Sequence, residues 1–188
     1  MVYDILKALC DELNNQLKYQ TNIAEDVLVL SNLVDMSGAK ALQTDNQIHL
    51  QLVRIEEDRT LNRAGGFRGL PMESGPRLFH AYVVFAANFS GKQYPLGLDY
   101  INRVLNYFVA NPILNPSNIS DLPSQIDSLA VELKNLEERE LSNLWGALGS
   151  KLLPHLYYKI SLIPVFKESG FERSTPAISG ISPNLQRK

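Results

Sequence analysis

The side chains that could carry out acid–base or metal chemistry are scattered along this sequence. The three histidines, His49, His80 and His155, are far apart, and none has a cysteine, histidine or carboxylate at the spacing of a metal-binding motif. Each falls in or beside a segment with the alternation of a β-strand. We therefore interpret them as structural residues and expect neither a metal nor any other cofactor.

The acidic run Glu56–Asp58 is the best remaining candidate for acid–base chemistry, in combination with either of the first two histidines. Successive side chains of a strand point to opposite faces, so neighbouring carboxylates there do not converge. The flanking Arg54 and Arg59 indicate instead a solvated or partner-binding charge cluster. A small enzyme with a site near Glu56 is an alternative, but the sequence favours a protein that is not an enzyme.

A glycine-rich segment, Ala64–Gly69, does not end in the Gly-Lys-Ser/Thr of a phosphate-binding loop. It lies within Thr60–Pro76, which has no periodicity and many glycines and prolines, so we expect a long loop there. Long loops in compact domains are usually either functional or disordered in the free protein. We predict that this loop contacts a partner, with Phe67, Arg68 and Leu70 as contact residues.

Composition restricts the classes of partner. The chain has 188 residues, 45% of them hydrophobic, which suits one packed domain, and its formal charge of −2 gives no attraction to nucleic acid. One cysteine excludes an intramolecular disulfide. No run approaches the roughly 20 apolar residues of a membrane span, and no signal peptide is visible, so we expect synthesis and folding in the cytoplasm and no membrane partner.

Hydrophobic periodicity predicts alternating helices and strands. In order, we expect a helix over 2–19, strands over 27–30 and 48–59, a buried strand over 78–87, a helix over 98–109, a strand over 129–133, a helix over 141–148 and a strand over 156–162. This order predicts an α+β fold, with a single mostly antiparallel sheet flanked by helices.

Particular residues follow from these patterns. In the first helix, Cys10 belongs to the buried face and Asn14 to the polar face. Leu98 and Val109 delimit the apolar stripe of the second helix, and Trp145 is expected to be a core anchor in the third.

After about residue 166, the chain contains Gly, Pro, Ser and Thr with scattered apolar residues. We predict a domain over 1–166 followed by an extended or flexible arm over 167–188. Ile178, Ile181 and Leu185 are spaced so that they could fill small pockets on a partner. The arm is therefore expected to dock on a neighbouring protein.

Six segments, in the same order, resemble the cap or tail-terminator proteins of extracellular contractile injection systems such as the antifeeding prophage. They are Met1–Asn14, Val29–Asp35, Leu52–Leu61, Phe85–Ser90, Phe108–Pro112 and Leu141–Gly149. The last of these, which contains Asn-Leu-Trp-Gly-Ala-Leu-Gly, is the most specific.

The resemblance implies a fold like that of phage tail terminators and a structural role without catalytic residues. It implies a homo-hexameric ring that caps the particle at the end distal to the baseplate, with the inner-tube protein and the sheath protein as partners. A second cap paralogue in the ring is compatible with it. Another ring, connector or baseplate component of the same particle is the alternative.

Overall fold

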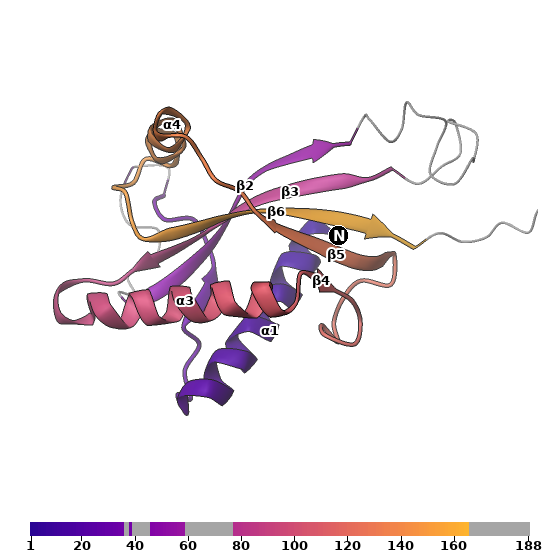
Figure 1. The fold of residues 1–188 in the computed structure, drawn as a ribbon, viewed down its shortest axis with the longest axis horizontal. Helices are drawn as coiled ribbons and strands as arrows, with labels where there is room; N and C mark the ends of the chain where they lie inside the picture. The colour runs from indigo at the N-terminus through magenta and orange to yellow at the C-terminus, as the bar shows by residue number, and fades with distance from the viewer. Residues whose placement is uncertain (36–37, 39–45, 59–76, 166–188) are drawn as a thin grey trace, which may run out of the picture.

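The computed structural model describes residues 1–35, 38, 46–58 and 77–165 (Figure 1). Within these ranges the elements are α1 (Val2–Thr21), β1 (Leu28–Leu30), β2 (Gln47–Glu57), β3 (Phe79–Asn88), the 3₁₀ turn η2 (Gly91–Gln93), α3 (Tyr94–Ala110), β4 (Ile113–Leu114), β5 (Ile126–Leu133), α4 (Glu138–Leu148) and β6 (His155–Pro164). No helix in these ranges is both long and apolar enough to cross a membrane.

The strands form one six-stranded sheet in the order β1-β2-β3-β6-β5-β4. Among the described strands, β1 and β2 pair in parallel, and every other pairing is antiparallel. The run predicted to be a buried strand is β3, which lies inside the sheet between β2 and β6. The predicted fold class is therefore confirmed.

The helices lie on both faces of the sheet (Figure 1). Alternation along β3 sends Phe85 into the cluster under α1 and α3, and it sends Ala86 to the opposite face under Trp145 of α4. We call the face toward which Phe85 points the helix face, and the face toward which Ala86 points the open face. α1 and α3 cover the helix face, whereas α4 lies over one end of the open face.

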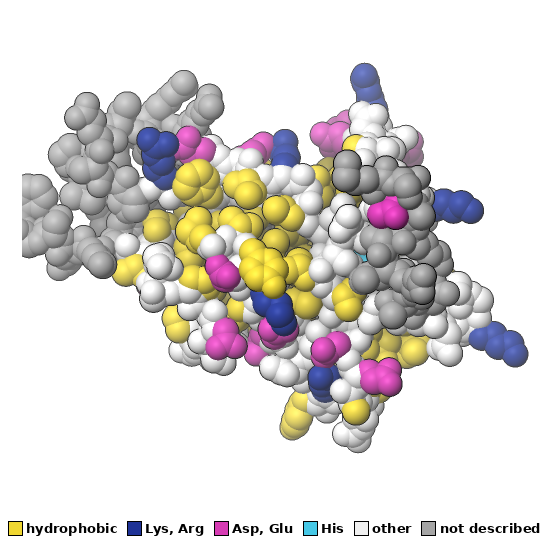
Figure 2. Space-filling view, turned by 180° about the vertical axis from the view of Figure 1, so that it is seen from behind, with side chains coloured by type: hydrophobic (Ala, Val, Ile, Leu, Met, Phe, Trp, Pro, Cys, Tyr) yellow, Lys and Arg dark blue, Asp and Glu magenta, His cyan; other side chains and the backbone are white. Residues whose placement is uncertain are grey.

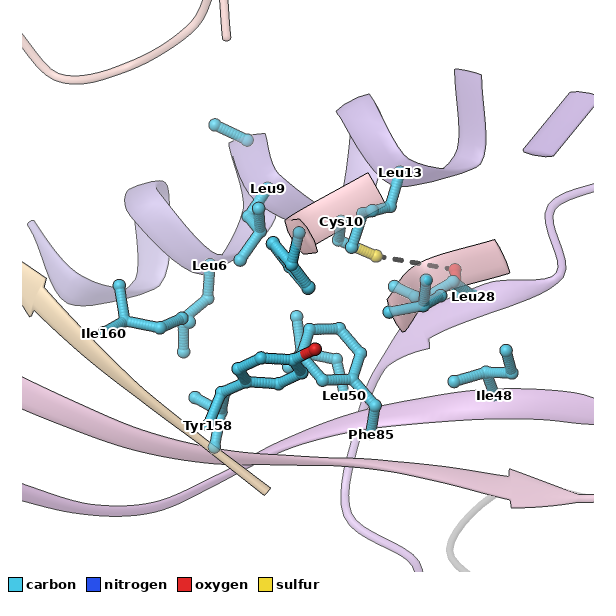
Figure 3. Close-up of a cluster of buried hydrophobic side chains, with 14 of the residues drawn as sticks. Leu6, Leu9, Cys10, Leu13, Leu28, Ile48, Leu50, Phe85, Tyr158 and Ile160 are labelled. Carbon is cyan, nitrogen blue, oxygen red and sulfur yellow. Dashed lines mark hydrogen bonds between the residues drawn. The ribbon is translucent and has the colours of Figure 1, made fainter. Parts of the chain in front are cut away.

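The main core fills the space between α1 and the sheet. Leu6, Leu9 and Leu13 of α1 point toward Phe85 and Tyr158 of the sheet (Figure 3). The predicted burial of Cys10 is confirmed: its thiol donates a hydrogen bond to the carbonyl oxygen of Leu28 at 3.4 Å. Burial raises the pKa of this thiol to about 12, which keeps it protonated.

Asn14 does not lie on the polar face of α1 as the helical pattern predicts. It is buried, and its amide binds the backbone of β1. Nδ2 donates to the carbonyl of Leu28 at 2.7 Å, and Oδ1 accepts from the N–H groups of Val27 and Leu28 at 3.1 and 2.9 Å. The amide thus pairs with three backbone groups of Val27 and Leu28, and it shares the Leu28 carbonyl with the Cys10 thiol.

The stripe predicted for α3 is confirmed in its middle and wrong at its two limits. Val104 and Phe108 are buried within it, together with Gly97 and Tyr100. Leu98 is 41% exposed and Val109 is 73% exposed. Gly97 allows α3 to pack closely against Phe89, because a Cβ at position 97 would come within 2.7 Å of the Phe89 ring.

α4 begins with a capping box between Glu137 and Glu140, and it ends at Gly149 with a left-handed φ of 68°. Trp145 is 4% exposed and packs against Leu33 and Ala86, so its predicted burial is confirmed.

Candidate functional site

The predicted contact residues Arg54 and Glu56 lie on the open face of the sheet, away from α4. A β-bulge between Leu52 and Arg54 sets their register, and it aligns Arg54 with Tyr82 of β3. The guanidinium carbon of Arg54 lies 4.2 Å from the centre of the Tyr82 ring. Arg54 Nη1 also forms an ion pair with Glu56 Oε1 at 2.9 Å.

A second tyrosine extends this cluster. The rings of Tyr82 and Tyr157 stack with their centres 6.0 Å apart and an interplanar angle of 28°. Burial raises the pKa of both hydroxyls, and a hydrogen bond with Glu56 raises that of Tyr82 further. Both tyrosines therefore stay neutral at physiological pH. Arginine and tyrosine are enriched at the energetic centres of protein interfaces, so this composition suits partner binding.

A second group of polar residues marks one end of the sheet. His80 Nε2 lies 3.1 Å from Asp58 Oδ2, and Arg77 Nη1 lies 3.5 Å from Glu57 Oε1. β6 ends beside them, because Phe79 of β3 is in register with Leu162. Residues 58, 77 and 165, where the chain leaves the described ranges, therefore lie at the same end of the sheet (Figure 1).

The histidines do not combine with Glu56 into a site. Glu56 and His80 are cross-strand neighbours, but each is already paired, with Arg54 and Asp58 respectively. His49 Nδ1 lies 2.8 Å from the Ser31 hydroxyl, farther along the sheet. No group of three or more potential metal ligands occurs in the described part of the chain.

Some predicted contact residues lie outside the described ranges. They are Arg59, Phe67, Arg68, Leu70, Ile178, Ile181 and Leu185. Their roles stay predictions.

Exposed apolar side chains also occur on the other face of β2. Figure 2 shows hydrophobic side chains gathered on the rear of the molecule. Ile55 lies between Arg54 and Glu56 in β2, points to the opposite face of the sheet and is 47% exposed. Exposed apolar patches on soluble domains commonly mark contact surfaces.

The contact role predicted for Arg54 and Glu56 stays a prediction, and nothing in the sequence pattern indicated the two tyrosines beside them. The apolar pattern placed Tyr82 in a strand buried on both faces. Its position opposite Arg54 depends on the register between β2 and β3, which the pattern does not give. The β-bulge that creates the Arg54–Tyr82 alignment has no glycine to mark it in the sequence.

The family described as Pvc16 N-terminal domain matches residues 4–177 of the chain. The chain belongs to this family. The resemblance to injection-system cap proteins inferred from the sequence is thereby confirmed. No curated protein sequence matches this Pvc16 N-terminal domain significantly.

Two solved structures share the fold of this Pvc16 N-terminal domain. One is the sheath/tube terminator of a PVC extracellular contractile injection system in the extended state, with a TM-score of 0.54 and 18% identity over 100% of this chain. The other is the tube-terminating cap of the anti-feeding prophage, with a TM-score of 0.50 and 17% identity over 93% of this chain.

The Pvc16 N-terminal domain is shorter than both of these proteins. It spans 64% of the sheath/tube terminator chain and 59% of the cap chain. At this level of identity the likeness establishes the fold.

Proposed function

We propose that this domain is a structural subunit of the ring that terminates and caps the inner tube and sheath of a contractile injection system, at the end distal to the baseplate. The observation that carries this proposal is family membership over 4–177, combined with a fold likeness to a sheath/tube terminator over the whole chain. The contacts of Arg54 with Glu56 and with the Tyr82 ring support assembly, because arginine and tyrosine are enriched at protein interfaces.

The ring is a homo-hexamer in this proposal, and its partners are the inner-tube protein and the sheath protein. A second cap paralogue can share the ring. Arg54, Glu56 and the two stacked tyrosines are proposed to contact another subunit of the particle. A closed ring needs two different surfaces on each subunit, because each copy contacts its neighbours head to tail.

The loop over 60–76 and the arm over 167–188 are proposed to be further contact segments. Both connect to the domain at the same end of the sheet, where residues 58, 77 and 165 lie. One ring neighbour or one layer of the particle could therefore contact both segments.

Particle assembly without this chain tests the proposal. Cells that make all other components are expected to produce tubes and sheaths of irregular length, because nothing stops their polymerisation. Adding the purified chain should restore regular ends, and a gold-labelled copy should appear at the end distal to the baseplate in electron micrographs. A label at the baseplate end would favour the alternative of a baseplate component, and a label along the sheath would contradict both.

Two shortened chains test the contact segments. Deletion of 64–75 should leave the domain folded but abolish ring assembly. Truncation after residue 167 should give a folded protein that still binds the tube end but no longer retains the sheath. Normal capping of sheathed particles by either variant would refute the role of that segment.

A further inference from the structure

A polar cleft lies where α1 passes the C-terminal end of α3. It has a volume of about 380 Å³ and is lined by Glu12, Gln16 and Gln20 of α1 and by Asn106 and Tyr107 of α3, among others. Glu12 is the only charged side chain among the described residues that line it. The rest of the polar lining consists of amides and hydroxyls.

The electrostatics of this cleft favour a cation. Gln16 Nε2 donates to Glu12 Oε1 at 2.9 Å and so orients the carboxylate. The last carbonyls of α3 add partial negative charge at the helix C-terminus. Burial, and then the Glu12 carboxylate, raise the pKa of Tyr107 to about 12, so its hydroxyl stays protonated. Arg103 of α3 pairs with Asp99 at 2.7 Å, and its Nη1 also donates to Oε1 of Gln20 at the edge of the cleft at 3.2 Å, so no ion pair joins it to Glu12.

The opposite end of α3 presents an exposed cation. Lys92 lies in η2, immediately before α3, and no described carboxylate is within ion-pair distance of it. A positive charge at a helix N-terminus is unfavourable, so an anion from another molecule would stabilise this end. Tyr94 and Leu98 lie beside Lys92, one helical turn apart, and are 47% and 41% exposed.

The cleft end of α3 has a matching apolar surface. Val109 and Ile113 are 73% and 58% exposed and flank Ala110 and Asn111, which also line the cleft. An exposed apolar pair therefore lies near each end of α3. Beside each pair is one charged side chain, Lys92 of η2 or Glu12 of α1, that has no ion-pair partner among the described residues. The two charges, on Lys92 and Glu12, have opposite signs.

These two ends cannot meet within one chain. α3 has 17 residues, which corresponds to a helix about 25 Å long. Two copies arranged head to tail can bring the N-terminal end of one α3 to the C-terminal end of the other. This is the heterologous geometry that a closed ring requires.

We propose that Lys92 of one copy enters the cleft of the next copy and forms an ion pair with Glu12 there. Tyr94 and Leu98 then pack against the exposed Val109 of that neighbour. The ligand of the cleft is thus the ammonium group of a second copy of this chain. This inference rests on the proposed function, because it assigns the contact that joins adjacent subunits of the ring.

Charge reversal tests this contact in the full chain, with assembly measured by native mass spectrometry and electron microscopy, alone and on purified tubes. Lys92→Glu and Glu12→Lys should each weaken the association between subunits about tenfold or more. The double variant Glu12→Lys/Lys92→Glu should restore association close to that of the wild type. Lys151→Glu and Glu25→Lys make the same charge changes at other exposed positions, and they should assemble normally.

Circular dichroism and thermal melting establish that each variant is folded, and Glu12→Gln provides a milder change in the half-buried cleft. If wild-type rings form and the single reversals assemble like the wild type, the inference is wrong and the proposed function stands. Failure of the double variant to rescue assembly would likewise overturn the inference. If the wild type forms no ring, alone or on tubes, the proposed function fails with it.

Discussion

The two faces of the sheet differ in how completely they are covered. On the helix face, α1 and α3 cover a continuous apolar cluster that includes Leu9, Phe85 and Tyr158. On the open face, the buried cluster under α4 consists of Leu33, Ala86 and Trp145, and Arg54 lies farther along, half exposed and stacked on tyrosine. The helix face accounts for most of the folding energy, whereas the open face leaves polar and aromatic side chains available to partners.

The largest effect is expected at Phe85, at the centre of the helix face. It is fully buried, and its ring centre lies 5.7 Å from that of Phe108 and 5.9 Å from that of Tyr158. Phe85→Ala should lower the free energy of unfolding by about 3–5 kcal/mol, because it removes these contacts and leaves a cavity. Urea denaturation measures this, with the exposed Tyr19→Ala as control. A loss similar to that of the control would contradict the assignment of this face as the main core.

Trp145→Ala tests the smaller cluster on the open face. We expect a loss of about 3 kcal/mol, at the lower end of the range for this substitution, because the Trp145 cluster has few buried members. Hydrogen exchange should show lost protection mainly in α4, whereas Phe85→Ala should lower protection throughout the sheet. Unchanged thermal stability of Trp145→Ala would mean that the residue does not anchor α4.

The open face should also make stability depend on pH. Burial lowers the pKa of His49 below its usual value near 6.5, so the folded state disfavours its protonated form. The unfolded chain binds the proton more readily. The contribution of His49 is therefore complete above pH 6.5 and is lost as the pH falls from there toward the lowered folded pKa, by at most about 1.4 kcal/mol per pH unit.

Replacing this histidine isolates its contribution. His49→Gln should flatten the decline in unfolding free energy between about pH 6.5 and 5. Urea titrations at several pH values measure the slope, with His155→Gln as control. An unchanged slope in His49→Gln would show that another group causes the decline.

The smallest effect on stability is expected at Arg54. Its ion pair and its contact with Tyr82 are largely exposed, so Arg54→Ala should cost less than about 1 kcal/mol. If the open face binds partners, the same substitution should weaken ring or particle assembly much more than it weakens folding. Lys134→Ala, which breaks the exposed pair with Glu132, is the matched control. Normal assembly of Arg54→Ala would remove the open face from the set of contact surfaces.

The sequence predicted strands and helices well where one pattern dominates a segment. Continuous apolar residues identified β3 as an internal strand, and four-residue spacing located α1 and the buried Trp145 of α4. These predictions were correct because the spacing of apolar residues within one segment is enough to indicate its secondary structure and its buried face. The domain boundary predicted at residue 166 stays a prediction.

The sequence was less informative where distant residues meet. The burial of Asn14 depends on its hydrogen bonds to the backbone of Val27 and Leu28, which a helical pattern does not reveal. The burial of Gly97 in α3 depends on its close approach to the Phe89 ring. The cleft near Glu12 is formed by α1 and by the end of α3, and no local pattern in either helix indicates it.

The place of β6 in the sheet has a consequence for biosynthesis. β6, the last described element of the chain, pairs with β3 on one side and β5 on the other. A nascent chain that ends before residue 155 therefore lacks the strand that joins the two halves of the sheet. The edges of β3 and β5 stay unpaired in such a chain, and pairing of strands distant in sequence is slow. The topology thus delays completion of the sheet until the chain has been translated through the last strand.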